Sequence, residues 1–373
     1  MSKVLLGDVA HEHKETCKGS KDGYPIVGLE HLIPEEITLT TWDEGSENTF
    51  TKMFRKGNVL FGRRRAYLKK AAVAPFDGIC SGDITVIEAD PDKILPDLLP
   101  FIIQNDDLFD FAVGKSAGSL SPRVKWEHLK NYEFELPDMD KQKELVELLW
   151  AIDDTKKSYQ ELIAATDELV KSQFMEQFNN HKRDRLGNFI EQVRGVSYKP
   201  KDLGSELDDH HITLLRANNV NGGTINFDEV QFVDRSKVSD VQVVREGDIL
   251  MCASSGSLDH VGKAALCRLA GEYTFGTFCK IIRPTGRLRP EYIVSYMNGH
   301  EYRHVIMELA QGSNINNLRN EHINDLMIPV PSDDEQREFI AFLEQSDKSK
   351  FEMEQALSEL TATYKRIITE NLG

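Results

Sequence analysis

The chain has 373 residues, 40% of them hydrophobic and 28% charged, and 45 basic against 61 acidic residues give a formal net charge of −16. Its length predicts two or three domains, and its longest apolar runs, such as Val59–Phe61, are too short for a membrane span. Because the N-terminus lacks a signal-peptide pattern and the five cysteines have no C-x-x-C spacing, we expect a soluble cytoplasmic protein without a disulfide framework or a zinc site.

The negative charge is unevenly distributed along the chain. Residues 1–137 carry 17 bases and 22 acids, 138–180 carry 5 and 10, 181–331 carry 18 and 19, and 332–373 carry 5 and 10. The second and fourth segments therefore hold 10 of the 16 excess negative charges, although they are short. The segment Lys52–Phe76 has eight bases and no acid. The overall charge thus does not exclude a nucleic-acid partner.

An internal repeat organises the whole chain. Adding 194 to the residue number carries Leu136-Pro137 onto Val330-Pro331, and Glu127-His128 onto Glu321-His322. Upstream the offset is smaller. Gly57-Asn58-Val59-Leu60 matches Gly247-Asp248-Ile249-Leu250 at an offset of 190. The second copy therefore has extra residues near its start, as loop insertions give. A collinear series of this kind indicates two copies of one unit.

The first part of each copy combines strand-like and helical segments. Short apolar runs predict the strands Asn58–Phe61, Ile84–Ile87, Asp248–Met251 and Cys279–Ile282. Helical patterns follow near Leu95–Phe111 and Pro290–Ala310. We expect a compact α+β domain in residues 1–137 and another in 181–331.

The second part of each copy has the heptad pattern of a coiled-coil helix. Core positions recur with 4-3 spacing, and they correspond one to one at an offset of 194. They are Leu145, Leu149, Ile152, Lys156, Tyr159, Ile163, Thr166 and Val170 in the first copy, and Phe339, Leu343, Ser346, Lys350, Met353, Leu357, Leu360 and Tyr364 in the second. Forty helical residues span about 60 Å. We expect spacer helices at 138–180 and 332–373, packed antiparallel as a coiled coil between two globular domains with pseudo-two-fold symmetry.

The chain contains no recognisable catalytic motif. It has no G-x-G-x-x-G, P-loop, H-E-x-x-H or G-x-S-x-G sequence, and the His210-His211 pair has no other ligands at metal-binding spacing. We therefore expect a non-catalytic protein without a metal site that recognises another molecule.

Candidate recognition segments lie at equivalent places in the two copies. A basic segment with an interleaved aromatic residue suits phosphate and guanine contacts, whereas amide and hydroxyl side chains suit adenine edges and phosphates. The alternatives are a basic surface turn and polar connectors. The candidate DNA-binding residues of the first copy are Arg63, Arg64, Arg65, Tyr67, Lys69, Lys70, Lys115, Ser116, Ser119, Arg123 and Lys125. Those of the second copy are Ser254, Ser255, Ser257, His260, Lys263, Asn314, Asn316, Asn317 and Arg319.

Taken together, these features resemble the DNA-specificity subunits of type I restriction–modification enzymes. The resemblance rests on the Gly-Asp-Ile-Leu run at 247–250 with its counterpart at 57–60, on the Pro–Gln–long-helix junctions, on Ser121–Trp126, on Phe174–Phe178, and on the order domain–helix–domain–helix. It implies that each globular domain reads one half of a split double-stranded DNA sequence. The helices are then the spacer and the docking surface for two methyltransferase subunits, which restriction subunits join.

The resemblance also implies where the chemistry of such a complex takes place. S-adenosylmethionine, ATP and magnesium belong to the partner subunits, so no cofactor is expected in this chain. A different interpretation makes the chain a coiled-coil scaffold whose end domains bind protein partners, and the acidic composition, with a pI of about 5.2, fits that interpretation too.

Overall fold

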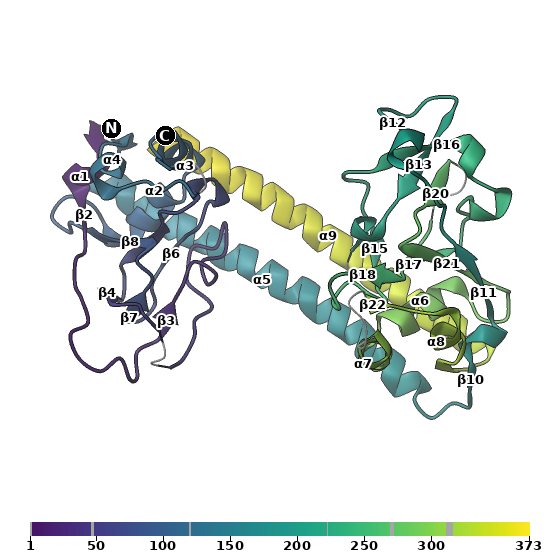
Figure 1. The fold of residues 1–373 in the computed structure, drawn as a ribbon. Helices are drawn as coiled ribbons and strands as arrows, with labels where there is room; N and C mark the ends of the chain where they lie inside the picture. Colours follow the sequence, from purple (N-terminus) through teal and green to yellow (C-terminus); the bar gives the residue numbers. More distant parts are fainter. Residues whose placement is uncertain (1, 46–47, 119–120, 222, 269–271, 311–315) are drawn as a thin grey trace. The chain divides into compact units, whose positions relative to one another are not determined.

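The computed structural model describes residues 2–45, 48–118, 121–221, 223–268, 272–310 and 316–373. The chain forms two compact units (Figure 1). Unit 1 comprises residues 1–161 and 353–373, and unit 2 comprises residues 162–352. Each unit is a mixture of helix and strand, as the sequence predicts. No helix in the described ranges is long and apolar enough to cross a membrane.

Unit 1 is built around small sheets. Its strands are ordered β2 (Ala10–Glu12), β8 (Ile84–Ala89), β5 (Val59–Gly62), β6 (Ala71–Val73) in one sheet, β3 (Ile26–Val27), β7 (Gly78–Cys80), β4 (Lys52–Phe54) in another, and β1 (Ser2–Leu5) with β9 (Glu133–Leu136) in a third. The helices are α1 (Leu6–Val9), α2 (Leu99–Ile103), α3 (Asp106–Gly114) and α4 (Trp126–Leu129), with 3-10 turns η1 (Ala66–Leu68) and η2 (Pro96–Leu98).

Unit 2 repeats this plan with additional strands. Its sheets are ordered β11 (Ile190–Arg194), β21 (Cys279–Pro284), β17 (Ile249–Cys252), β19 (Ala264–Leu266), and β12 (Leu203–Gly204), β16 (Gln231–Asp234), β13 (His211–Leu215), β20 (Tyr273–Phe275). Three strand pairs join β10 (Arg183–Arg185) to β23 (Met327–Pro329), β14 (Val220–Asn221) to β15 (Thr224–Ile225), and β18 (Ser254–Ser255) to β22 (Asn316–Asn317). The helices are α6 (Pro290–Asn298), α7 (His300–Ala310) and α8 (Asn320–Asn324), and 3-10 turns are η3 (Leu186–Asn188), η4 (Pro200–Asp202), η5 (Ala217–Asn219), η6 (Arg235–Lys237) and η7 (Asp240–Gln242).

The sequence repeat is therefore a structural repeat. The sheet β2-β8-β5-β6 has the same order and the same antiparallel pairing as β11-β21-β17-β19. The parallel pair β3·β7 corresponds to β13·β20, and the terminal pair β1·β9 to β10·β23. The stretch that holds the extra residues of the second copy includes β14 and β15, which pair antiparallel. The two predicted helical stretches are each divided, since Asn105 caps α3 and Gly299 separates α6 from α7.

The two predicted long helices are present. α5 spans Met139–Phe178 and α9 spans Asp333–Leu372, each with 40 residues. In unit 1, Leu149 near the start of α5 lies in one hydrophobic core with Ile368 near the end of α9. In unit 2, Phe174 near the end of α5 packs against Phe339 near the start of α9, with ring centroids 5.4 Å apart. Within each unit the two helices thus run antiparallel.

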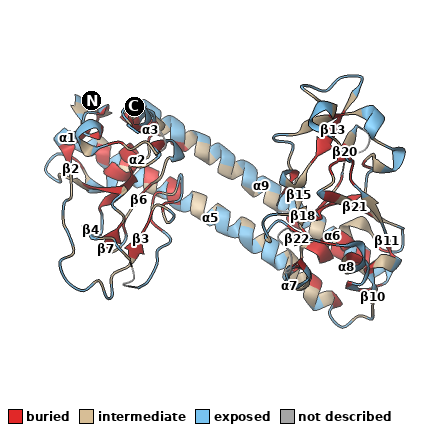
Figure 2. Ribbon diagram, in the orientation of Figure 1, coloured by how far each residue is buried: buried red, intermediate tan, exposed pale blue. Residues whose placement is uncertain are grey.

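Buried residues are concentrated in the sheets and the short helices, whereas the long helices expose much of their surface (Figure 2). The expected core positions Tyr159, Ile163, Thr166 and Val170 are only half-buried. Two helices alone cannot enclose a residue on all sides, so only positions that also contact a globular part become buried. Of the two lysines at core positions, Lys156 lies over the ring of Tyr364 at 4.9 Å, and Lys350 binds the carboxylate of Asp167 at 2.9 Å.

A buried glutamine joins each long helix to its globular part. The Gln142 side chain accepts a hydrogen bond from the Leu95 N–H at 3.0 Å and donates one to the Pro137 carbonyl at 2.9 Å. Gln336, at the equivalent position, accepts from the Arg289 N–H at 2.8 Å. Both residues are at most 2% exposed. The same helix start is therefore anchored in the same way in both copies.

We expect Gln142→Ala to lower the free energy of unfolding of unit 1 by about 2 kcal/mol, because it leaves buried backbone groups without partners. The exposed Gln160→Ala on the same helix is the control, with a change under about 0.5 kcal/mol. Urea unfolding followed by tryptophan fluorescence measures unit 1 alone, since Trp42, Trp126 and Trp150 all lie in it and the chain has three tryptophans. Equal unfolding midpoints for the two variants would contradict the anchoring role.

Candidate nucleic-acid interface

In unit 1, two candidate segments far apart in sequence meet through their backbones. The Val124 N–H donates to the Arg63 carbonyl at 3.0 Å, and the Arg65 N–H donates to the Pro122 carbonyl at 2.9 Å. Arg64 and Arg123 form an isolated antiparallel bridge. The basic segment after β5 and the segment before α4 thus form one continuous surface, which we call surface 1 (residues 63–65 and 121–125).

Unit 2 has the equivalent surface. The Leu318 N–H donates to the Ala253 carbonyl at 2.9 Å, and β18 pairs with β22 so that Ser254 lies opposite Asn317. Adding 190 to Arg63 gives Ala253, and adding 194 to Val124 gives Leu318. The two contacts therefore correspond in the repeat. We call residues 253–255 and 316–319 surface 2.

An aspartate organises the cations of surface 1. Asp83 accepts hydrogen bonds from Arg123 Nε at 2.7 Å and Nη2 at 3.2 Å, and Arg64 Nη1 lies 3.5 Å from the same carboxylate. The hydrogen bond from Arg123 holds the pKa of Asp83 below its ordinary value, and the charges of Arg64 and Arg63 act in the same direction. Asp83 is therefore ionised near neutral pH, and its one carboxylate binds two arginines, Arg123 and Arg64, whose charges it cannot fully neutralise.

The three adjacent arginines have different environments. Arg64 donates from Nε to the Ser121 hydroxyl at 2.6 Å, so its orientation is fixed. The Nε of Arg63 is buried and has no hydrogen-bond partner among the described residues. Arg65 is exposed and adopts a left-handed backbone conformation, with φ of 53°. Next to it, Tyr67 is 55% exposed. Arg65 and Tyr67 are the members of this segment most accessible to a ligand.

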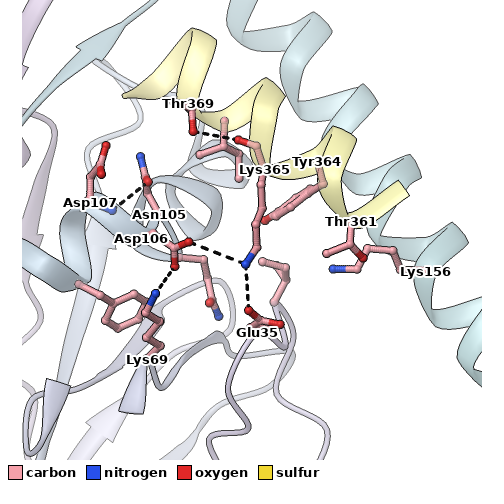
Figure 3. Close-up of a pocket in the computed structure, with 14 residues that line it drawn as sticks. Glu35, Lys69, Asn105, Asp106, Asp107, Lys156, Thr361, Tyr364, Lys365 and Thr369 are labelled. Carbon is pink, nitrogen blue, oxygen red and sulfur yellow. Dashed lines mark hydrogen bonds and ion pairs between the residues drawn. The ribbon is translucent and has the colours of Figure 1, made fainter. Parts of the chain in front are cut away.

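Two predicted DNA-binding lysines point towards the protein instead. The Lys70 ammonium donates to the Leu29 carbonyl at 2.7 Å, and the Lys69 ammonium donates to Asp106 at 2.5 Å. Lys69 lines a cavity of about 80 Å³ in unit 1, where Asp106 and Glu35 also bind Lys365 of α9 (Figure 3). The hydrogen bond with Asp106 raises the pKa of Lys69. This ion network therefore links the basic segment to the last turns of α9.

The remaining candidates of the first copy surround surface 1. Lys115 is exposed, with its ammonium 5.6 Å from the centroid of the Phe111 ring, and Ser116 donates to the Ala112 carbonyl at 2.8 Å. Lys125 is exposed at the N-terminus of α4. Ser119 lies outside the described residues. The cations Lys115 and Lys125 are thus available to a ligand, whereas the hydroxyl of Ser116 serves the end of α3.

The candidates of the second copy form a less basic surface. Ser254 and Ser255 are half-buried, Ser257 and His260 are exposed, and Lys263 is half-buried. Two side chains of α7 hold their loop in place. The Tyr302 hydroxyl donates to the Gly262 carbonyl at 2.8 Å, and Arg303 Nη1 donates to the Val261 carbonyl at 2.6 Å. The backbone of Asn316 pairs with Ser255, Asn317 is exposed, and Asn314 lies outside the described residues.

A histidine that was not predicted orients Arg319. Nε2 of His322 accepts hydrogen bonds from Arg319 Nε at 3.0 Å and Nη2 at 2.7 Å. Burial, followed by the charge of Arg319, lowers the pKa of His322, which keeps the ring neutral and able to accept. The repeat pairs His322 with His128, but nothing in that pairing indicates this contact, because residue 125 of the first copy is a lysine.

A pair of turns was also missed. The Ile84 N–H donates to the Ser81 carbonyl at 3.0 Å, and the Cys279 N–H donates to the Gly276 carbonyl at 2.9 Å. Residues 81–84 and 276–279 therefore form β-turns that lead into β8 and β21. Asp83 and Phe278 occupy the third position of these turns. Gly82 and Gly276 lie in these turns, but Gly82 is the second residue of its turn and Gly276 the first of its own, so their match at an offset of 194 is one residue out of step with the pair Asp83 and Phe278.

One group of side chains has the composition of a metal site. Glu30, His31 and Asp43 have ligand atoms within 4.8 Å of one another, in a search of the described residues. However, His31 Nδ1 accepts a hydrogen bond from the Gly28 N–H at 2.9 Å. With the Nδ1 lone pair used in this way, Nε2 is the protonated nitrogen and faces Asp43 at 3.6 Å, so neither ring nitrogen offers a lone pair to a cation. The group is better described as a hydrogen-bonded histidine between two carboxylates.

Sequence and structure comparisons identify relatives of the chain. The type I restriction modification DNA specificity domain matches residues 3–165 and 232–361. A type I restriction enzyme StySPI specificity subunit from Salmonella potsdam is 35% identical over 167 residues, which cover 44% of this chain and 36% of that protein. The chain thus spans about a third of the length of this relative.

Two solved structures share the fold. One, from work on complex assembly and conformational transition of the type I R-M system, has a TM-score of 0.59 at 20% identity and covers 99% of this chain and 97% of its own. The other, a type I restriction-modification S subunit from M. genitalium, has a TM-score of 0.56 at 12% identity and covers 100% and 96%. Since the family model matches both copies of the repeat, the chain belongs to the family of type I restriction–modification DNA specificity proteins.

Proposed function

We propose that this chain is the DNA-specificity subunit of a type I restriction–modification complex, in which surface 1 and surface 2 each read one half of a bipartite double-stranded DNA site. The observation that carries the proposal is the repeated backbone pairing with different side chains. Val124 N–H to Arg63 carbonyl in one unit corresponds to Leu318 N–H to Ala253 carbonyl in the other. One scaffold that presents two sets of side chains suits a protein that reads two different sequences.

The side chains of the two surfaces fit different base edges. In surface 1, Arg65, Arg64 and Arg123 offer guanidinium groups, which bind guanine bidentately and clamp phosphates. In surface 2, Asn317 offers an amide suited to adenine, and Arg319 offers a guanidinium held by His322. The family membership favours this function over a scaffold that binds only proteins.

The acidic long helices have a separate role in this proposal. Segments 138–180 and 332–373 each carry a net charge of −5, so they repel DNA and leave the contact to the domains at 1–137 and 181–331. We assign to these helices the spacing of the half-sites and the docking of two methyltransferase subunits, which restriction subunits join in the cytoplasm. Methylation and cleavage, with S-adenosylmethionine, ATP and magnesium, belong to those subunits.

Methylome sequencing tests the proposal. The host is compared with and without this chain, with its modification subunit present in both. We expect one bipartite methylated motif to disappear when the chain is removed and to return when the chain is restored. An unchanged methylome, together with no sequence preference in DNA selection by the assembled complex, would contradict the proposal.

The exposed arginine of surface 1 gives a sharper test. We expect Arg65→Glu to weaken DNA binding by the assembled complex by roughly tenfold or more, since a hydrogen bond to a charged group contributes about 1.5–3 kcal/mol. If Arg65 contacts a phosphate, the slope of log K against log salt falls by about one unit. Lys93→Glu, an exposed charge reversal elsewhere in unit 1, is the control. Equal affinities and slopes for both variants would remove Arg65 from the interface.

The helices predict how the half-site spacing depends on their length. Lys350 binds Asp167 at 2.9 Å, so these residues lie at the same level of the antiparallel pair. A heptad inserted after Thr166, matched by a heptad after Lys350, keeps the core register and adds about 10 Å. Site selection from random DNA should then give the same half-sites with a spacer longer by roughly three base pairs, at 3.4 Å each. An unchanged spacer would show that the helices do not set the distance.

A further inference from the structure

An exposed phenylalanine lies at the base of surface 2. Phe278 is 62% exposed. Its backbone, in contrast, is fixed. The N–H groups of Ala253 and Ser254 both donate to the Phe278 carbonyl, at 2.8 and 3.0 Å. A bulky apolar side chain is therefore exposed on a hydrogen-bonded backbone position directly beside β18 of surface 2.

The repeat gives this position a counterpart. In unit 1 the Arg63 N–H donates to the Asp83 carbonyl at 3.0 Å, as the Ala253 N–H does to the Phe278 carbonyl in unit 2. Both residues are third in a β-turn that precedes β8 or β21. In unit 1 the side chain at this position binds Arg123 and Arg64, and it thereby orients two candidate DNA-binding groups. The same backbone position thus belongs to the recognition surface in both units.

The neighbours of Phe278 explain why an apolar group is useful there. Besides the guanidinium of Arg319, surface 2 presents hydroxyl and amide groups, such as those of Ser254 and Asn317, which lie opposite each other. These groups read hydrogen-bonding edges, but they cannot recognise the C5-methyl group of thymine, which is read by apolar contact. The Phe278 carbonyl accepts from the Ser254 N–H, and Ser254 lies opposite Asn317, whose amide we assign to adenine. An exposed phenyl ring at this position is suited to the thymine of an A·T pair.

We propose that Phe278 is a specificity-determining residue of unit 2 that recognises a thymine by contact between its ring and the C5-methyl group. This inference rests on the proposed function, since it requires that surface 2 faces the major groove. It goes further by naming the residue and the base.

The test couples a side-chain deletion with deletion of the methyl group. The assembled complex of wild-type chain and modification subunit is titrated with its own DNA site, in which each thymine of both half-sites is replaced in turn by deoxyuridine. The same series is repeated with Phe278→Ala. Phe351→Ala is the matched control, because Phe351 is 64% exposed and also lies in unit 2, on α9.

We expect one replacement to weaken wild-type binding by roughly threefold to fivefold, the contribution of one buried methyl group. That replacement should have no effect in Phe278→Ala, and it should retain its full effect in Phe351→Ala. Phe278→Leu, which keeps an apolar side chain, should retain part of the effect. Unfolding midpoints equal to wild type are expected throughout, since the ring of Phe278 is not part of a core.

Three results would overturn the inference. They are equal sensitivity of wild type and Phe278→Ala to every replacement, a site without thymine in either half, and a loss of affinity in Phe278→Ala without coupling to any thymine. The last result is also the one expected of a ring that inserts between base pairs. Sequence-specific binding by the wild-type complex shows in each case that the proposed function itself still holds.

Discussion

The backbone pairing that joins two distant segments in each unit is the interaction on which the candidate site depends. It connects residue 63 to residue 124 in unit 1 and residue 253 to residue 318 in unit 2. Because the main chain makes these contacts, they do not require particular side chains. The residues on the paired strands can therefore differ completely between the copies, as three arginines and Ala-Ser-Ser do, while the geometry of the surface is kept.

The second common constraint is the way the long helices are attached. A polar side chain in a core is costly unless it is hydrogen-bonded, and Gln142 and Gln336 each satisfy backbone groups of a neighbouring loop. Because hydrogen bonds are directional, such contacts restrict the angle between each long helix and its globular part more closely than apolar packing alone does. The glutamine that follows Pro137 or Pro331 is thus a structural residue, and its recurrence in the repeat reflects the fold more than the function.

The repeat, the strands at 58–61 and 279–282 and both long helices could be predicted from the sequence, because they depend on periodicity and on internal similarity. The pairing of residues 63–65 with 122–124 could not, since it is a contact between residues about sixty positions apart that have no pattern in common. Nor could the inward direction of Lys69 and Lys70, because an exposed lysine and a lysine bound to Asp106 or to the Leu29 carbonyl look the same in a sequence. Asp83 was not predicted as part of the site either. A single acid near many bases is unremarkable until its distance of 2.7 Å from Arg123 is known.

The division of the chain into units has a consequence for the order of folding during synthesis. Unit 2 is continuous from residue 162 to residue 352, whereas unit 1 combines residues 1–161 with 353–373. The core of unit 1 contains Tyr364, Ile368 and Leu372, so its first 161 residues leave the ribosome with part of that core missing. Unit 2 begins later in the sequence, but all of its residues have been synthesised before residues 353–373 complete unit 1. The N-terminal part of the chain must therefore wait, with apolar surface of α5 uncovered, until the last turns of α9 have been synthesised.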